Sequence, residues 1–499
     1  FARIEQFNAI GDGTDRIFVI DQRGKMYYFT PGDVSPTLYF DFGANIPDFK
    51  NANQLGLRGF AFHPNAFTPG EPGYQKMYTA HHRSNPLRSV VSEWTLDGST
   101  NVIAASMREL LTRNQPEWDH NVGKVKFNPN VPTNDPDFGN LYISFGDGAN
   151  YKTEAGDTIL NPNGQNKLNF FGTILRINPL QDGSNPYTIP EDNPFVGDAD
   201  FLPEIWAYGL RNPHQFSWDT EGSNLMLIAN IGQSNAEEIE LGISGANYGW
   251  PIREGTFDMT GKAPDNPIAA DTLPADHTND VYTYPLAQYD HDFDNQGQNS
   301  AAIAGGFVYR GTQIAELRGK YIFGNFGTSS NVARFGAADT NIFQDVYVVD
   351  VDQLQLRDDF SDYYSYHDGF LAPIQRVQLV DTNNMPINLL ELVRDISGNS
   401  TQRRTDMRFG IDNDGEVYIS SKKSGCIWRF VGSSSVTLSI EQTGANETTI
   451  SWTPETQGVV LQESSNLLSN DWSNVFTGPT NPAVIPTTGT NKYYRVVIP

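Results

Sequence analysis

The 499-residue sequence carries 59 acidic and 34 basic side chains, which gives a formal net charge of −25. A surface this acidic argues against nucleic acid and anionic membranes as partners, because both bind to basic faces. No stretch approaches the roughly 18 apolar residues that a membrane helix needs. The single cysteine, Cys426, excludes an intrachain disulfide and a cysteine-based zinc cluster.

The length exceeds what one hydrophobic core usually organises, so we expect two or more units. The chain begins at Phe1 rather than Met. A leader could therefore have been removed or left out of the sequence, and we expect an exported protein that is secreted, periplasmic or held at the cell surface.

Short strand–turn–strand units recur along the chain. Apolar and polar residues alternate, and Gly, Asp or Asn bound each run, which is typical of half-buried antiparallel strands. The runs are Arg16–Thr30, Leu141–Gly148, Asn224–Asn230, Lys320–Phe326 and Glu416–Val431. The helical pattern at Ala104–Thr112 is too short to organise a fold. We therefore expect an all-β protein.

Three β architectures fit this pattern: a sandwich, a barrel and a propeller. Residues 1–432 are too many for one sandwich, and a barrel does not explain the long segments between hairpins. Six blades would take about 72 residues each, more than the ~40–45 of a minimal propeller repeat, which leaves room for long functional loops. A six-bladed β-propeller over residues 1–432 is the prediction.

The composition of the sequence changes after Val431, where the small, polar stretch GSSSV begins a new region. Strand-like runs then follow to the end of the chain. Residues 433–499 are therefore expected to form a small fibronectin- or immunoglobulin-like β-sandwich. They contain neither His nor Cys, so an accessory role in attachment or stability is expected.

Five segments, in order, resemble the soluble sugar dehydrogenases of the glucose/sorbosone dehydrogenase family, which use pyrroloquinoline quinone (PQQ). They share the family's loop and strand motifs and are Asn53–Asn65, Asp119–Phe127, Tyr208–Asp219, Ile231–Pro251 and Ala304–Gly311. The resemblance implies a six-bladed propeller that oxidises sugars with PQQ and calcium. The residues agree with a bound cofactor, because no side chain accepts hydride and no GxGxxG nicotinamide motif opens a βα unit.

The resemblance also implies roles for individual residues. His120 matches the general base, and neutral imidazole suits proton abstraction near neutrality. Asp119 and Gln54 match substrate contacts. Arg211 matches a PQQ contact that also stabilises charge on the quinone oxygen, and Asn212 matches a second PQQ contact.

Structural alternatives remain for these positions. His120 could be a loop histidine, and Arg211 could pin a loop between blades. His63, in AFHP, is expected to pack or to cap a turn. The family's paired arginines have approximate counterparts in Arg404 and Arg408.

Two calcium sites are implied by the same resemblance. Gly232 and Gln233 match the positions whose carbonyls hold the calcium bound to PQQ. Glu238, the carbonyl of Tyr248 and Asp258 match a second, structural site. A role in the fold alone is the alternative for this Gly-rich segment.

An EF-hand at Asp290, Asp292 and Asp294 is rejected, because no Gly stands at position 6 and position 12 is Ala301. The sequence also departs from the family's glucose-oxidising members. No Lys stands between Phe323 and Phe335, where Arg334 is the one cation.

A Gln expected after the GDG turn is also replaced, near Asn150 or Tyr151. These departures are typical of the broader aldose and sorbosone branch.

Three functional hypotheses follow. The first is calcium- and PQQ-dependent oxidation of the anomeric hydroxyl of aldoses to lactones, with electrons passed to an external cytochrome or quinone. The second is a non-catalytic, calcium-braced propeller that binds carbohydrate or a surface partner. A propeller lactonase is the third, and no motif of such enzymes supports it.

Overall fold

The computed structural model describes most of the chain. The described residues are 2–149, 152–154, 157–159, 162–233, 236–259, 282–290, 302–326, 346–355, 371–377, 379–380, 387, 389–402, 404–432, 437–444, 446–453, 460–465, 472–475, 481–486 and 492–497. The chain divides into two compact units. One comprises Phe1–Leu379 with Pro386–Val431, and the other Val380–Met385 with Gly432–Pro499.

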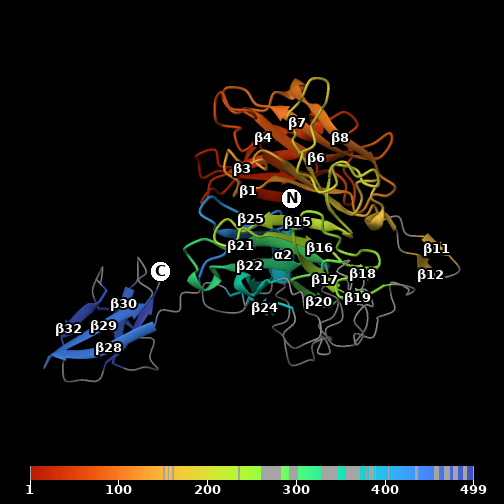
Figure 1. Ribbon diagram of the computed structural model, residues 1–499. Helices are drawn as coiled ribbons and strands as arrows, with labels where there is room; N and C mark the ends of the chain where they lie inside the picture. The colour runs from red at the N-terminus through yellow and green to blue at the C-terminus, as the bar shows by residue number, and fades with distance from the viewer. Residues whose placement is uncertain are drawn as a thin grey trace. The chain divides into compact units, whose positions relative to one another are not determined.

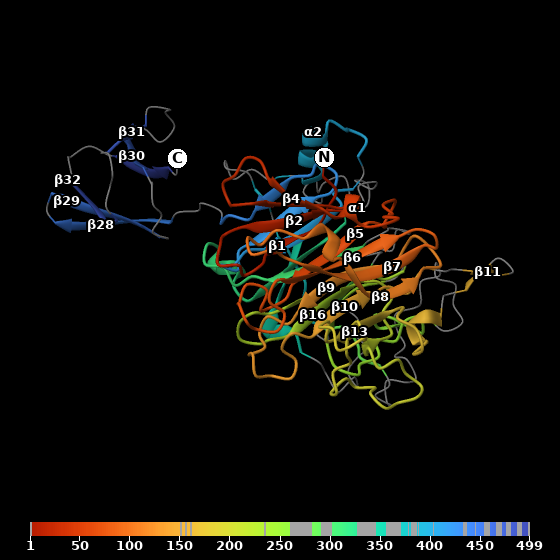
Figure 2. The same cartoon turned by 90° about the horizontal axis from the view of Figure 1, so that it is seen from above.

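The first unit contains six antiparallel sheets in chain order (Figures 1 and 2). The first three are β1–β4 (Ile4–Ala9, Ile17–Asp21, Lys25–Phe29, Thr37–Asp41), β5–β8 (Leu57–Phe62, Lys76–Arg83, Arg88–Thr95, Arg108–Asn114) and β9, β10, β13, β14 (Val122–Phe127, Leu141–Phe145, Thr173–Ile177, Ile205–Tyr208).

The next three are β15, β16, β17, β20 (Pro213–Trp218, Met226–Asn230, Ala236–Leu241, Ala287–Asp290), β21–β24 (Ile303–Val308, Lys320–Asn325, Val346–Asp350, Gln375–Arg376) and β25–β27 (Met407–Ile411, Val417–Ser421, Ile427–Arg429).

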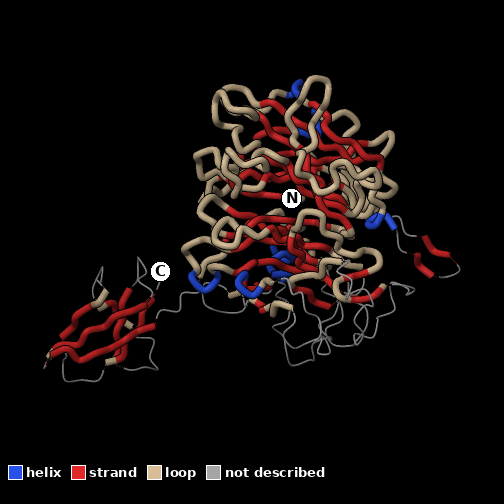
Figure 3. Tube along the Cα trace, in the orientation of Figure 1, coloured by secondary structure: helices blue, strands red, loops and turns tan. Residues whose placement is uncertain are grey.

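Smaller elements complete this unit. Two short hairpins are β11–β12 (Lys152–Glu154, Asp157–Ile159) and β18–β19 (Arg253–Glu254, Phe257–Asp258). Among the described residues, the helices of this unit are α1 (Phe42–Asn45) and α2 (Leu389–Ser397), with single 3₁₀ turns at Ala104–Ser106, Pro162–Gln165, Ala315–Leu317 and Val351–Gln353. Strands dominate the trace in Figure 3.

The six sheets form a closed ring. The first strand of each sheet contacts that of the next, in the order β1, β5, β9, β15, β21 and β25, and β25 contacts β1 again. Each interface between neighbouring sheets has its own apolar cluster, such as Phe18 with Trp94 between the first two sheets. The predicted six-bladed propeller is confirmed.

Burial of the strands differs from the sequence-based expectation in one respect. Some runs predicted as half-buried strands, such as β10 and β16, are buried at every position, whereas β3 keeps exposed and half-buried positions as expected. The reason is that a strand within a blade is covered on both faces by neighbouring blades. The segment Ala104–Thr112 is a 3₁₀ turn that leads into strand β8.

The second unit contains two three-stranded sheets. They are β28, β29, β32 (Thr437–Gly444, Glu447–Thr453, Ala483–Pro486) and β31, β30, β33 (Ser473–Asn474, Val460–Ser464, Tyr493–Val497). Ile450, Trp452 and Leu461 join the two sheets in one small core. The fibronectin- or immunoglobulin-like sandwich stays a prediction. Within the described residues, no helix is long and apolar enough to cross a membrane.

Candidate functional site

The predicted site residues lie where the innermost strands begin. Gln54 precedes β5, Asp119 and His120 precede β9, and Arg211 and Asn212 precede β15. These strands start side by side, because a Cβ built on Gly123, near the start of β9, would lie 3.5 Å from the carbonyl oxygen of Pro213, at the start of β15. The propeller therefore brings these residues to one end of its central channel.

His120 is held in a fixed orientation by a buried carboxylate. Its Nδ1 lies 2.6 Å from Oδ1 of Asp147, and its Nε2 lies 3.8 Å from Oδ2 of Asp119. The backbone of His120 has φ 47°, in the left-handed region, where non-glycine residues are uncommon. Side chain and backbone of His120 are thus both held in one conformation.

The tight turn Gly146–Gly148 packs against the backbone of His120. Gly148 donates its backbone N–H to the carbonyl of His120 at 3.0 Å. A Cβ on Gly146 would lie 2.7 Å from that same carbonyl oxygen, so only glycine fits at this position. The turn Gly146–Gly148 therefore places Asp147 directly against the imidazole.

Asp147 is the centre of a hydrogen-bond network. Its Oδ2 accepts the indole N–H of Trp250 at 2.8 Å, and its Oδ1 accepts the backbone N–H of Ala149 at 3.0 Å. Burial works against its charge, but the neighbouring His120 and Arg211 outweigh burial and lower the pKa of Asp147. The group is therefore an anion that fixes the proton of His120 on Nδ1.

Arg211 contacts this network through its guanidinium and its backbone carbonyl. Its guanidinium carbon is 5.5 Å from the ring centroid of Trp250, and its backbone carbonyl accepts the N–H of Asp147 at 2.7 Å. The guanidinium also donates to the carbonyl of Gly232 and to the side-chain oxygen of Gln233. Arg211 thus joins the His120 network to the predicted calcium loop.

The donor set fits a polar ligand at this end of the channel. Asn121, next to His120, is buried, and neither its Nδ2 nor its Oδ1 has a hydrogen-bond partner among the described residues. Asn212 is 7% exposed, and no partner of its side-chain amide is found within the described ranges. Buried amides normally have partners, so a bound ligand would satisfy them.

The predicted calcium loop is shaped by glycine. A Cβ on Gly232 would lie 1.8 Å from the carbonyl oxygen of Ala236. Glu254 Oε1 accepts the backbone N–H groups of Gln233 and Ala236, the second at 3.2 Å. These bonds hold the backbone of Gly232 and Gln233 in place, although one of the two carbonyls already accepts from Arg211.

The second predicted calcium site contains buried carboxylates. Glu238, on β17, accepts from Gly255 N and from Nδ2 of Asn230. Burial raises the pKa of Glu238 to about 8, and the charge of Glu254 adds to this. Burial and the charge of Glu238 also raise the pKa of Glu240.

The other predicted ligands of this site are placed less fully. The hydroxyl of Tyr248 donates to the carbonyl of Leu241 and lies near Glu240. The side chain of Asp258 lies outside the described part of the chain. In the part that the structure describes, no group of three or more His, Cys, Asp or Glu side chains is arranged as a metal site.

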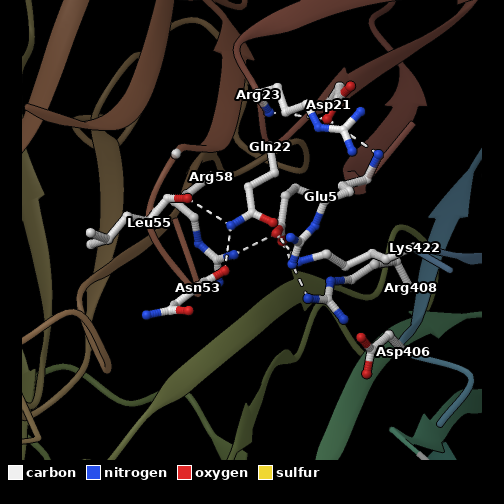
Figure 4. Close-up of polar contacts among 12 residues, drawn as sticks. Glu5, Asp21, Gln22, Arg23, Asn53, Leu55, Arg58, Asp406, Arg408 and Lys422 are labelled. Carbon is white, nitrogen blue, oxygen red and sulfur yellow. Dashed lines mark hydrogen bonds and ion pairs between the residues drawn. The ribbon is translucent and has the colours of Figure 1, made fainter. Parts of the chain in front are cut away.

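The structure does not bring Arg404 and Arg408 together as a pair. Arg404 is 53% exposed at its side chain, with Nε 3.2 Å from Oδ1 of Asp406. Arg408 is buried inside the channel, with Nη2 3.2 Å from Oε2 of Glu5. Figure 4 shows Arg58, Arg408 and Lys422 all pointing toward that glutamate.

Glu5 is the hub of the channel interior. Oε1 lies 2.6 Å from Nη1 of Arg58 and also pairs with Lys422. Nζ of Lys124 donates to the carbonyl of Glu5 at 2.8 Å. Burial opposes ionisation of Glu5, yet these cations hold its pKa well below its usual value.

Several predicted positions cannot be compared. Asn150, Tyr151, Asp292, Asp294 and Arg334 lie outside the described residues. His63 behaves as expected, since it accepts the backbone N–H of Asn65 at 3.0 Å and packs against Phe127.

Sequence reasoning missed Asp147, Trp250, Glu254 and Glu5. Asp147 stands in the GDG turn and Trp250 in the segment Ile231–Pro251, so both were within recognisable motifs. Their roles depend on contacts between residues 27 and 103 positions apart, which no local pattern reveals. For Glu254 and Glu5 no sequence signal was available.

The chain matches one protein family and is similar to several known proteins. The sequence profile described as glucose/sorbosone dehydrogenase matches residues 5–358. HIPL2 protein of Arabidopsis thaliana is 29% identical over 363 residues, covering 62% of this chain and 49% of that protein. Human Hedgehog-interacting protein is 26% identical over 328 residues, covering 63% and 40%.

Quinoprotein glucose dehydrogenase B of Acinetobacter calcoaceticus is 28% identical over 261 residues, covering 50% of each chain. The chain spans about half the length of the curated relatives it matches. Among solved structures, PQQ-bound aldose sugar dehydrogenase of Streptomyces coelicolor superposes with a TM-score of 0.50 at 15% identity, covering 86% of this chain and 94% of that one. This likeness concerns the fold.

Proposed function

The chain belongs to the glucose/sorbosone dehydrogenase family, and from this premise we propose that it oxidises the anomeric hydroxyl of an aldose to the lactone. The oxidation would require PQQ and calcium and would pass electrons to an external cytochrome or quinone. The observation that carries the proposal is the His120–Asp147 pair at the mouth of the channel, with Nδ1 and Oδ1 2.6 Å apart. Such a pair is the arrangement of a general base with its orienting carboxylate.

The proton transfer follows from this geometry. Asp147 binds Nδ1 and keeps the imidazole proton there, so Nε2 is the basic nitrogen. Nε2 takes the proton of the anomeric hydroxyl, and the imidazolium that forms is stabilised by the carboxylate of Asp147. Asp119, whose Oδ2 lies 3.8 Å from Nε2, and Gln54 would orient the sugar.

The cofactor contacts are proposed on donor chemistry. PQQ, when bound, supplies the hydride acceptor that no side chain provides. Arg211 would meet the cofactor's anionic oxygens with paired N–H groups, and the buried amide of Asn212 would bind beside it. Arg408 is an unsuitable ligand while its guanidinium pairs with Glu5, so Arg404 is the better candidate of the two.

Calcium is proposed on similar grounds. The carbonyls of Gly232 and Gln233 offer hard oxygen ligands for the cofactor's ion. Glu238, with the Tyr248 carbonyl and Asp258, would hold a second ion. A cation fits there because the carboxyl groups of Glu238 and Glu240 are buried together and repel each other when both are ionised.

A second candidate function is a non-catalytic propeller that binds carbohydrate or a protein partner. The similarity to Hedgehog-interacting protein favours it, and so does the absence of a Lys between Phe323 and Phe335. The second unit, residues 433–499, is proposed as an accessory module for attachment or stability, and export from the cell is proposed for the whole protein.

The two candidates are separated by reconstitution. Purified protein is stripped with chelator, supplied with PQQ and calcium, and assayed on a panel of aldoses with an artificial electron acceptor. We expect turnover that requires both additions. We also expect the melting temperature to rise, since a ligand at a hundredfold excess over its Kd stabilises the native state by about 2.7 kcal/mol. A protein that neither binds PQQ nor oxidises any aldose supports the binding propeller instead.

A further inference from the structure

A groove lies between the third and fourth blades. It has a volume of about 260 Å³ and is lined by Tyr142, Trp206, Trp218, Asn224 and Met226, among others. Tyr142 and Trp206 belong to the third blade, and Trp218 and Met226 to the fourth. The groove is therefore formed by the interface of two blades.

This groove lies at the end of the blades opposite His120. Strand β9 starts beside His120 and ends at Phe127, and the lining residue Asn128 follows it. Strand β15 starts beside Arg211 and ends at the lining residue Trp218. Strands of this length span roughly 17–20 Å, so the groove is separate from the site at the channel mouth.

The lining is uncharged and combines apolar residues, Leu225, Met226 and Leu241 among them, with aromatic and asparagine side chains. None of the residues that line the groove is Asp, Glu, Lys or Arg, although the chain carries a net charge of −25. Tryptophan, tyrosine and asparagine side chains provide ring surface together with hydrogen-bonding groups. Such a lining suits a neutral ligand that has both apolar and hydrogen-bonding surfaces.

Two tryptophans of the groove carry indole N–H groups that have no hydrogen-bond partner among the described residues. Trp206 and Trp218 are 7% and 8% exposed. Neither indole nitrogen forms a hydrogen bond within the described residues, and neither is among the fully buried unpaired atoms. Buried tryptophans usually find a partner for this group, so both N–H groups keep contact with solvent and can donate to a ligand.

The two rings are held in place in advance. The ring of Tyr142 packs edge-on against both indoles, with centroid distances of 5.3 Å to Trp206 and 5.1 Å to Trp218. The Tyr142 hydroxyl is in turn bound by both carboxylate oxygens of Asp137 at 3.0 Å. A preorganised donor pair loses little side-chain entropy when a ligand binds.

We propose that this groove binds one pyranose ring of a neutral saccharide. Ring hydroxyl and ether oxygens accept from the two indoles, the C–H face of the sugar covers the aromatic edges, and the Asn224 amide bonds to a further hydroxyl. The volume of about 260 Å³ is below the range of pockets for drug-sized ligands, so it takes a single ring. The proposal does not rest on the sugar oxidation proposed above.

The probe is a methyl glycoside, because it lacks the anomeric hydroxyl and cannot be a substrate for that oxidation. Methyl α-D-glucopyranoside, methyl β-D-galactopyranoside and methyl α-D-mannopyranoside are titrated by saturation-transfer NMR and tryptophan fluorescence. The variants are Trp206→Phe and Trp218→Phe, which keep a ring but lose the N–H. Trp472→Phe, in the second unit, is the matched control, and His120→Gln reports on the channel mouth.

At least one probe is expected to bind. Each groove variant should weaken the affinity roughly two- to tenfold, the effect of one lost hydrogen bond, while Trp472→Phe and His120→Gln leave it unchanged. Crystals soaked with the bound probe should show it between Trp206 and Trp218. The proposal is overturned if no probe binds, if binding survives both groove variants unchanged, or if the soak places the sugar only at the channel mouth.

Discussion

Trp250 donates its indole N–H to the carboxylate of Asp147 at 2.8 Å, the same carboxylate that binds His120 on its other oxygen. Trp250 thus holds the carboxylate of Asp147 in place, and that carboxylate orients the imidazole of His120. Because the indole also lies under the guanidinium of Arg211, the proton-accepting and cofactor-binding parts of the site share one rigid support.

Removing the base should abolish most turnover without unfolding the protein. His120→Gln keeps a polar side chain but lacks a basic nitrogen, so kcat should fall by about 10²–10⁴-fold. PQQ and calcium binding, measured by fluorescence and calorimetry at saturating cofactor, should be retained. Turnover at the wild-type rate would show that another group takes the proton.

Asp147→Asn tests the orientation of the imidazole separately. The amide can still hydrogen-bond His120, but it no longer stabilises the imidazolium or selects the Nδ1–H tautomer. We expect a fall in kcat with little change in KM. Steady-state kinetics measured beside wild type check this, and an unchanged kcat would contradict it.

Glu5 should be essential to stability. Glu5→Gln leaves Arg58, Arg408 and Lys422 buried without their anion, and breaking a buried pair in this way costs about 3–5 kcal/mol. Glu221→Gln is the control, because Glu221 pairs with Arg318 at the surface, where such pairs contribute about 0–1 kcal/mol. Urea denaturation of both variants gives the comparison. Equal losses in the two variants would mean that the channel network contributes no more than a surface pair.

Lys126 predicts a pH dependence of stability. Burial lowers its pKa to about 7, and no carboxylate pairs with it among the described residues; its ammonium lies 4.8 Å from the ring centroid of Phe307. The unfolded chain, with a lysine pKa of about 10.4, binds more protons between pH 7 and 10. The free energy of unfolding should therefore rise with pH across this window.

Lys126→Met should remove that rise and should be more stable than wild type at pH 7. Lys25→Met, at an exposed position of β3, is the control and should keep the wild-type slope. Denaturation curves at several pH values between 7 and 10 decide the point. Parallel slopes for wild type and Lys126→Met would assign the dependence to other groups.

The second unit should be dispensable for the fold of the first. Its core is formed by residues between Leu438 and Tyr494, and the last strand of the propeller ends at Arg429. A chain ending after Val431 should melt cooperatively and keep any dehydrogenase activity. Aggregation of that chain would show that the C-terminal residues are needed to complete the propeller.

Sequence patterns predicted the propeller correctly, because strands and their turns are local. The roles that motifs suggest for His120 and Arg211 stay predictions. The patterns did not reach Asp147 as the partner of His120, since that pairing depends on how two loops meet. They also assigned Arg408 to the cofactor, whereas the structure buries it against Glu5. One motif can place a residue on a strand, but only the assembled ring shows what the side chain faces.

The closure of the ring has a consequence for synthesis on the ribosome. Glu5 is synthesised well before two of its partners, Arg408 and Lys422, which follow 403 and 417 positions later. Within the described strands, the first blade is built entirely from N-terminal strands and the last entirely from C-terminal ones. Early blades can therefore form while the chain is still growing. The carboxylate of Glu5, on β1, stays only partly neutralised until Arg408 and Lys422 have been synthesised.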